Sequence, residues 1–308
     1  MSLRIEKIDA PHSPQYAEWA AQNGDIFSDP KWIQIQTETS STYVIRDDSN
    51  WLGCFTINQE RKWGIPLFRN PHFTPHICWS WNHIANKTAS QNNSWKSAME
   101  LMIDFFKNQK LSKIEFSFPT PVVDLQNFVW QGFQVQPKYT YQIDLTSSFE
   151  NISSQISSSH RNHFNKAKKD GVQWVIQHDP QEMERLVTAT FNRKNKKYHS
   201  IYLHKILHEF CNADNSLMCM AMFEGKVIAG ATAIFNAKKA YLLLSGYIEE
   251  NKHGGAGIGC VIQLIESCQK RLIPVFDFEG SMLPEVEVYF RGFGGEIKPY
   301  LSINKKIL

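Results

Sequence analysis

A run of glycines near residue 255 is the clearest candidate for phosphate binding in this chain. The run Lys252-His253-Gly254-Gly255-Ala256-Gly257-Ile258-Gly259 lies between a predicted strand and a predicted helix. Backbone N–H groups at the start of a helix attract anions, and glycines let a phosphate approach them closely. Lys252 and His253 would add positive charge. The run predicts a site for a phosphate-bearing donor; an ordinary structural turn is the alternative.

Two carboxylates follow in the next predicted strand, residues 274–279. Asp277 and Glu279 alternate along it, so both would point to one face of a sheet. Carboxylates beside a donor site are suited to binding or deprotonating an amine. The alternatives are a pair of surface acids, or an acid that caps Gly280-Ser281.

Tyr247 lies near the end of the strand predicted for residues 241–248. It either lines an acceptor cleft or packs in the core. Ser245 and Gly246 beside it indicate a β-bulge, which would splay the strands and expose backbone N–H groups.

Basic residues are concentrated between Arg161 and Lys205, where lysine and arginine clearly outnumber the acids. Such an excess suits a phosphate-bearing partner, and a solvated helix face is the equal alternative. Arg161, Lys166 and Lys168 are candidates for binding a phosphorylated acceptor or the end of a tRNA. Aromatic residues are sparse there, so a general nucleic-acid platform is not indicated.

Histidines raise the question of a metal site. His204 and His208 are spaced to share one helical face, which is a spacing that can hold zinc. The sequence shows no third ligand and no HExxH motif, so no metal is expected. His160 and His163 are interpreted as residues of a polar helix face.

Composition limits the class of protein. With 42% hydrophobic and 20% charged residues, the 308-residue chain can bury a core without disulfides or metal. No cysteine pair has CxxC spacing, which favours a reducing, cytoplasmic compartment. No signal peptide is expected at the start, and no apolar run approaches the roughly 20 residues of a membrane helix.

The elements that must position these residues are clearest in the second half of the chain. Their predicted order is helix, strand, helices, a three-strand meander over residues 217–248, the glycine run, a helix over 260–271, a strand, a helix and a closing strand. A meander followed by a βαβ crossover implies a mixed α/β sheet with helices on both faces.

The first half shows a weaker version of the same order, with a helical stripe over residues 94–108. Two related α/β domains, 1–145 and 146–308, are therefore predicted. Four tryptophans of the first half are interpreted as packing residues, with ring stacking on a ligand as the alternative: Trp63, Trp79, Trp81 and Trp95.

Three segments resemble FemAB-like proteins, which are tandem GNAT folds. They are Tyr139–Leu145, the helix Ser159–Val172 with its Lys-Ala-Lys stretch, and Asp277–Ser281 followed by Tyr289–Gly295. The resemblance extends over almost the whole chain and is stronger after residue 139. Lys252, Gly255 and Gly257 occupy the places of the GNAT loop Gln/Arg-x-x-Gly-x-Gly/Ala, with lysine replacing glutamine or arginine.

The resemblance implies direct attack by an amine on a thioester or ester, without a covalent enzyme intermediate. It makes Tyr289 a candidate general acid, because GNAT enzymes often use a tyrosine in this helix; core packing is the alternative. Arg161, Lys168 and Ser281 are expected to bind substrate. Characterised FemAB-like members transfer amino acids from aminoacyl-tRNA to peptidoglycan precursors.

Three functions follow as hypotheses. The first is an acyltransferase that moves an acetyl or longer group from a coenzyme A thioester to an amine of a small or cell-envelope-related acceptor. The second is an aminoacyl-tRNA-dependent peptide ligase, and the third is a non-catalytic binding protein on a GNAT scaffold. A monomer or a homodimer is expected.

Overall fold

The structure is a computed structural model that describes residues 3–62, 65–82, 85, 87–109, 112–195, 197–280 and 282–306. By its internal contacts the chain divides into two compact units. The N-terminal unit comprises residues 1–138 and 299–308, and the C-terminal unit comprises residues 139–298. This division falls before the predicted domain boundary at 145/146 and assigns the end of the closing strand to the N-terminal unit; the domain assignment itself stays a prediction.

The N-terminal unit contains a mixed sheet with strand order β1-β2-β3-β4-β6-β13, and a short strand β5 pairs with β3. These strands are β1 Arg4–Ile8, β2 Ser40–Arg46, β3 Trp51–Lys62, β4 Ile65–Arg69, β5 Ser80–Trp81, β6 Lys113–Ser117 and β13 Glu296–Lys306. The helices are α1 Pro14–Asn23, α2 Pro30–Gln36, α3 Thr88–Asn108 and α4 Gln126–Trp130.

The core of the N-terminal unit is aromatic. Helix α3 buries the predicted stripe, including Met99, Met102 and Phe106. Trp79 stacks on Trp81, with 6.1 Å between ring centroids, and meets Trp95 edge-on at 5.6 Å. The three tryptophans therefore pack with one another and with the core, whereas Trp63 lies outside the described residues.

In the C-terminal unit the strands form a mixed sheet region with the order β7-β12-β11-β10-β9-β8. Its strands are β7 Gln134–Asp144, β8 Gln173–Ile176, β9 Ser216–Phe223, β10 Lys226–Phe235, β11 Ala240–Tyr247 and β12 Val275–Asp277. Strands β8 to β11 pair antiparallel, β11 pairs parallel with β12, and β12 pairs antiparallel with β7. The predicted meander, crossover and mixed α/β sheet are confirmed.

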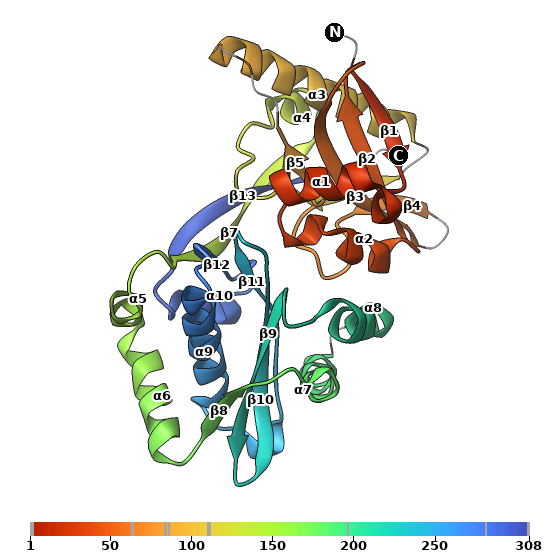
Figure 1. Cartoon of the computed structure of the whole chain (residues 1–308). Helices are drawn as coiled ribbons and strands as arrows, with labels where there is room; N and C mark the ends of the chain where they lie inside the picture. The colour runs from red at the N-terminus through yellow and green to blue at the C-terminus, as the bar shows by residue number, and fades with distance from the viewer. Residues whose placement is uncertain are drawn as a thin grey trace. The chain divides into compact units, whose positions relative to one another are not determined.

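Helices cover both faces of the strands of the C-terminal unit, as Figure 1 shows. On one face, α9 (Ala256–Lys270) packs on β9 and β10, and α6 (Ser158–Lys169) packs on α9. On the other face, α7 (Pro180–Arg193) packs on β10 and β11, followed by α8 (Ser200–Lys205) and the π-helical turn η3 (Ile206–Phe210). The remaining helices are α5 Phe149–Gln155 and α10 Pro284–Arg291.

Local sequence signals explain several helix starts. Asp179 caps α7, because its carboxylate accepts a hydrogen bond from Glu182 N at 2.9 Å, and Pro180 occupies the first helical position as predicted. Helix α9 begins at Ala256, earlier than the predicted start at Cys260. Half of the predicted glycine loop therefore forms the first turn of the helix itself.

Candidate functional site

Strand β11 separates from β12 along most of its length. The two strands pair only at Ala240 with Phe276 and Tyr241 with Asp277, whereas β11 continues to Tyr247. On its opposite edge β11 stays paired with β10 up to Tyr247. Among the described residues, the later part of β11 thus has one edge without a strand partner. The bulge lies at Leu242–Leu244, opposite Thr232 and Ala233, and not at Ser245–Gly246 as predicted.

A cavity of about 320 Å³ lies beside this open strand edge in the C-terminal unit. Four parts of the unit form its wall: the first half of β10 with the end of β11, the glycine loop with the first turn of α9, the helix α10, and the end of α7. The lining residues are Thr190, Lys194, Ile228–Gly230, Ser245–Tyr247, Lys252–Gly254, Ala256–Ile258, Glu285, Val286, Tyr289 and Phe290. The cavity thereby joins most of the predicted loop to two predicted tyrosines.

The start of α9 offers backbone N–H groups to this cavity. The amides of Gly255 and Ala256 are engaged by His253, through its Nδ1 at 3.2 Å and its carbonyl oxygen at 3.0 Å. The next two amides, of Gly257 and Ile258, donate to no other group in the described part of the chain. Free amides at a helix start, together with the helix dipole, favour an anion.

The glycines of the loop serve two different purposes. A Cβ atom at Gly255 would lie 2.1 Å from the carbonyl oxygen of His163, and one at Gly259 would lie 2.1 Å from the Trp174 ring. These two glycines allow α6 and the β8 tryptophan to pack against α9. A Cβ at Gly257 would meet only the Tyr289 hydroxyl, at 3.6 Å. Gly257 is thus the glycine of the helix start that faces open space in the cavity.

The two basic residues of the loop differ. The Lys252 side chain is half exposed and forms an ion pair with Glu249, Nζ to Oε1 3.5 Å. The His253 ring accepts the Gly255 N–H at Nδ1 and contacts the Asp170 carboxylate through Nε2 at 3.1 Å. A ring that accepts at Nδ1 carries its proton on Nε2 and is neutral. The expected positive charge therefore comes from Lys252, and His253 instead shapes the loop.

Tyr289 lies on α10 with its hydroxyl towards Gly257 in the cavity wall. No hydrogen bond to another described group engages that hydroxyl. Burial raises the pKa of Tyr289 well above its usual value of 10. The phenol is therefore a neutral proton donor at physiological pH.

His160 holds Tyr289 in place from α6. Its Nε2 donates to the Tyr289 carbonyl oxygen at 3.0 Å, and its ring packs edge-on against Phe293 at 4.7 Å. His160 is 8% exposed, so its interpretation as a polar-face residue is wrong. Burial lowers the pKa of His160 below its usual 6.5.

Tyr247 is fixed by α7 at the rim of the cavity. Thr190 Oγ1 accepts the Tyr247 N–H at 3.1 Å, and the Arg193 guanidinium lies over the Tyr247 ring at 3.9 Å. Arg193 Nη2 is buried without a hydrogen-bond partner among the described residues. The end of α7 thereby adds cationic groups, Arg193 and Lys194, to this side of the site.

Asp277 and Glu279 lie apart from the cavity wall. Strand β12 ends at Asp277, and Glu279 has a left-handed φ of 59°, so the prediction that the two carboxylates alternate along one strand is wrong. Asp277 is 3% exposed. Its carboxylate accepts from Thr140, Gln142, Lys239 and the Glu279 N–H, at 2.6, 2.7, 3.3 and 2.9 Å. This network ties β7, β12 and the start of β11 together.

The predicted substrate-binding residues are also not among those that line the cavity. Arg161 and Lys168 lie on the exposed face of α6. Ser281 lies outside the described residues. A catalytic or substrate-binding role for all these residues stays a prediction.

Sequence reasoning missed four residues of the site: Thr190, Arg193, Lys194 and Glu285. Glu285 supplies the one carboxylate among the cavity-lining residues, from the exposed first turn of α10. Arg193 and Lys194 belong to the basic region but had no signal that separated them from their neighbours. Their position at the end of α7, next to β11, distinguishes them, and that proximity is tertiary.

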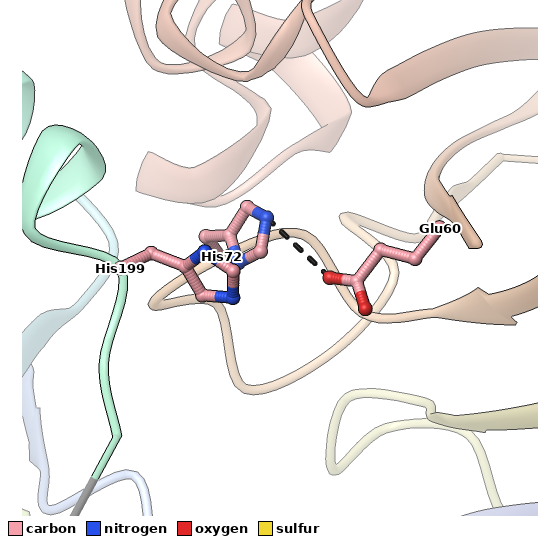
Figure 2. A group of neighbouring side chains, drawn as sticks. All are labelled: Glu60, His72 and His199. Atoms are coloured by element: carbon pink, nitrogen blue, oxygen red, sulfur yellow. Dashed lines mark ion pairs between the residues drawn. The ribbon is translucent and has the colours of Figure 1, made fainter. Parts of the chain in front are cut away.

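The N-terminal unit has a buried polar group of its own. His72 forms an ion pair with Glu60, Nε2 to Oε1 3.5 Å (Figure 2). The Asn58 side-chain amide contacts both residues, His72 Nε2 at 3.2 Å and Glu60 Oε1 at 2.9 Å. The third labelled residue in Figure 2, His199, belongs to the C-terminal unit. Within the N-terminal unit these three polar side chains form one hydrogen-bonded cluster on β3 and the loop that follows β4, in which Asn58 Oδ1 is buried without a partner among the described residues.

Two further observations concern the predicted location of the protein. All six cysteines are free and buried. Among the described residues, no helix has the length and apolar character needed to cross a membrane.

Comparisons with known proteins agree with this architecture. Residues 155–291 match the family model of the acetyltransferase (GNAT) domain. Over 100% of this chain and 98% of the other, the structure resembles FemX, with 12% identity and a TM-score of 0.66. L-PGS from Bacillus licheniformis has 11% identity and a TM-score of 0.60, with 97% of this chain and 93% of L-PGS covered. A tandem GNAT protein from the clavulanic acid biosynthesis pathway has 11% identity and a TM-score of 0.55, with 99% and 98% covered. None of the curated proteins matches the sequence.

The fold and the matched domain define the class: residues 155–291 match the acetyltransferase (GNAT) domain, and the chain has the fold of tandem GNAT proteins. Within that class the predicted resemblance to FemAB-like tandem GNAT proteins is confirmed. At 11–12% identity the likeness to the solved structures extends to the fold alone.

Proposed function

We propose that the chain transfers an acyl group from a coenzyme A thioester to an amine, with the donor bound in the cavity of the C-terminal unit. The observation that carries this proposal is the convergence of the free Gly257 and Ile258 amides, the unpaired edge of β11 and the Tyr289 hydroxyl on one cavity. Each of the three suits a different part of an acyl-CoA.

The helix start suits the pyrophosphate. Its free amides and the neighbouring Lys252 and Lys194 would hold the negative charge. The open edge of β11 suits the amide-bearing pantetheine arm, because a strand edge offers alternating N–H and C=O groups that can pair with an extended amide chain. A cavity of about 320 Å³ accepts such an arm with a short acyl group.

Tyr289 and Glu285 suit the chemistry. The acceptor amine attacks the thioester carbonyl, the tetrahedral intermediate collapses, and the carbon–sulfur bond breaks. The neutral Tyr289 hydroxyl donates a proton to the departing thiolate. Glu285, the carboxylate of the cavity wall, takes the proton of the amine directly or through water. Asp277 has a structural role in this proposal, because its hydrogen bonds tie β7, β12 and the start of β11 together.

A second candidate function is aminoacyl transfer from aminoacyl-tRNA. The exposed basic face of α6 favours it, with Arg161, Lys166, Lys168 and Lys169 on one helix, and so does the fold likeness to FemX. Both donors present a phosphate-bearing carrier and an activated carbonyl. Either donor places the reaction in the cytoplasm.

Calorimetric titration with acetyl-CoA, longer acyl-CoAs and aminoacyl-tRNA tests the proposal. We expect acetyl-CoA to bind, and the response to weaken in a Gly257→Ala variant. Binding of aminoacyl-tRNA alone, lost when Arg161 and Lys168 are changed to glutamate, would replace the first function with the second. If neither acetyl-CoA nor aminoacyl-tRNA binds, the remaining hypothesis is a non-catalytic binding protein on a GNAT scaffold.

A further inference from the structure

Three metal-ligating side chains meet on the surface of the C-terminal unit, outside the donor cavity. His204 Nδ1 lies 3.1 Å from Glu184 Oε2, and His208 Nε2 lies 2.9 Å from the same oxygen. The two imidazole rings stack, with centroids 4.3 Å apart. One ligand atom from each residue lies within 4.8 Å of the other two.

The third ligand of this group could not be recognised from the sequence. Glu184 is 20 residues before His204 and belongs to a different helix, α7. The histidine pair has a spacing that can hold zinc, but the sequence showed no third ligand and so predicted no metal. The packing of α7 against the α8–π segment supplies the carboxylate that the pair lacked.

Buried neighbours hold the three ligands on rigid elements. Apolar side chains on both sides of the ligands are buried between the helices and the sheet: Met183, Leu186, Val187, Leu203, Ile206 and Leu207. His208 lies in the π-helical turn, where Cys211 N donates to Ile206 O at 2.9 Å across five residues. Such turns are rare and are frequent at functional sites. Here the π turn contains His208 and directly follows α8, which contains His204.

The distances suit a small divalent transition-metal ion. Zinc lies about 2.0–2.2 Å from imidazole nitrogen and carboxylate oxygen, which separates ligand atoms by about 3.3 Å in a tetrahedron. The two observed nitrogen–oxygen distances, 2.9 and 3.1 Å, are a few tenths of an ångström shorter. Small side-chain rotations are enough to admit the ion, because all three side chains are at least partly exposed.

We propose that Glu184, His204 and His208 form a binding site for a zinc-class divalent ion. Two imidazoles and one carboxylate select ions such as Zn²⁺, Co²⁺ and Ni²⁺ over Mg²⁺ and Ca²⁺, which prefer oxygen ligands. The bound ion joins α7 to the α8–π segment and leaves its remaining coordination positions to water. The site is independent of the donor cavity and does not rest on the proposed acyl transfer.

The competing explanation is a surface network in which Glu184 accepts hydrogen bonds from both imidazoles. Such a network needs no metal, and exposed pairs of this kind contribute little to stability. The two explanations differ in one measurable property, namely the affinity of the chain for Zn²⁺.

The test uses the full chain without a histidine tag, freed of metal with a chelator. Zn²⁺ binding is measured by calorimetry, and Co²⁺ binding by the visible absorption of the bound ion. The variants are Glu184→Gln, which is isosteric, and His208→Gln. His12→Gln is the matched control, because His12 is an exposed histidine paired with Asp9 at 3.1 Å and has no place in the triad.

We expect one Zn²⁺ per chain, a rise in the unfolding temperature with Zn²⁺, and no effect of Mg²⁺. Each ligand variant should weaken Zn²⁺ binding by at least about 100-fold, since even the loss of outer-shell partners costs about 10–100-fold. His12→Gln should bind as the wild type does. Circular dichroism of the metal-free variants verifies their folding, and Glu184→Gln serves as the ligand variant if His208→Gln does not fold. Zn²⁺ binding that persists in Glu184→Gln, or no Zn²⁺ binding by the wild type, would overturn the proposal.

Discussion

Two glycines two residues apart on α9, which point to different sides of the helix, should separate donor binding from packing. At Gly257 an added methyl group would enter the cavity and meet only the Tyr289 hydroxyl at 3.6 Å, an ordinary contact distance. At Gly259 the same methyl group would lie 2.1 Å from the Trp174 ring, whose Nε1 donates to Ala256 O at 2.9 Å. Gly257→Ala and Gly259→Ala therefore make a matched pair.

The expected magnitudes follow from these contacts. Gly257→Ala should leave the free energy of unfolding unchanged or raise it by up to about 1 kcal/mol, because alanine is the better helix former. Its methyl group would hinder hydrogen bonds from the helix start to a charged phosphate, each worth about 1.5–3 kcal/mol. The dissociation constant for acetyl-CoA should therefore rise about 10–100-fold.

Gly259→Ala should show the opposite pattern. Displacing the Trp174 ring is an overpacking change that costs about 1–3 kcal/mol. At about 2–4 °C for each kcal/mol, this should lower the unfolding temperature by several degrees. Folded Gly259→Ala protein should bind acetyl-CoA with an affinity closer to that of the wild type than Gly257→Ala does.

Thermal unfolding and calorimetric titration of both variants supply the measurements, with the wild type beside them. If Gly257→Ala binds acetyl-CoA as tightly as the wild type, the start of α9 is not the phosphate site. If Gly259→Ala keeps the wild-type unfolding temperature, the packing role assigned to that glycine is wrong.

Four further substitutions probe the chemistry and its support. Tyr289→Phe should lower kcat about 100-fold and leave the dissociation constant of the donor unchanged, as steady-state kinetics and calorimetry would show; an unchanged kcat would remove Tyr289 as the general acid. Glu285→Gln should lower kcat/KM most at the pH where the acceptor amine is still protonated. If the ratio of kcat/KM between wild type and variant is the same at every pH, Glu285 is not the general base. Asp277→Asn should destabilise the chain by about 2–4 kcal/mol in denaturant unfolding, because it leaves Lys239 beside a neutral amide, whereas activity per folded molecule should persist. Since burial lowers the pKa of His160, its contribution to stability is complete above about pH 6.5 and is lost as the pH falls below that value; His160→Gln should flatten this acid dependence of the unfolding free energy.

The sequence determined most of the fold of the C-terminal unit. The alternating apolar runs of the meander, the cap at Asp179 and the glycine run before an apolar helix are local signals, and each produced the element it predicted. Apolar periodicity and helix capping depend on residues that are close in the sequence, so they can be recognised without knowing which segments pack against each other. The same local signals placed the start of α9 too late, because glycines that break isolated helices are tolerated where close packing requires them.

The sequence alone identified only some of the residues of the candidate site. The glycine run and Tyr247 could be found from residue type and position along the chain, and Tyr289 from the GNAT resemblance; in the structure most of the run and both tyrosines line one cavity. The carboxylate pair could not be judged in this way, because the strand ends at Asp277 and Glu279 adopts a left-handed backbone conformation. A predicted alternation fails wherever tertiary contacts end a strand early.

Proximity between distant segments was decided by the tertiary structure alone. It brings Thr190, Lys194 and Glu285 to the cavity of the C-terminal unit, it brings Arg193 to the Tyr247 ring, and it brings Glu184 to the two histidines of the α8–π segment. None of these residues differs in type or local pattern from its surface neighbours. Their positions depend on how α7 packs against β11 and against the π-helical turn η3, and on where α10 meets the cavity. Packing of this kind is set by side chains far apart in the chain.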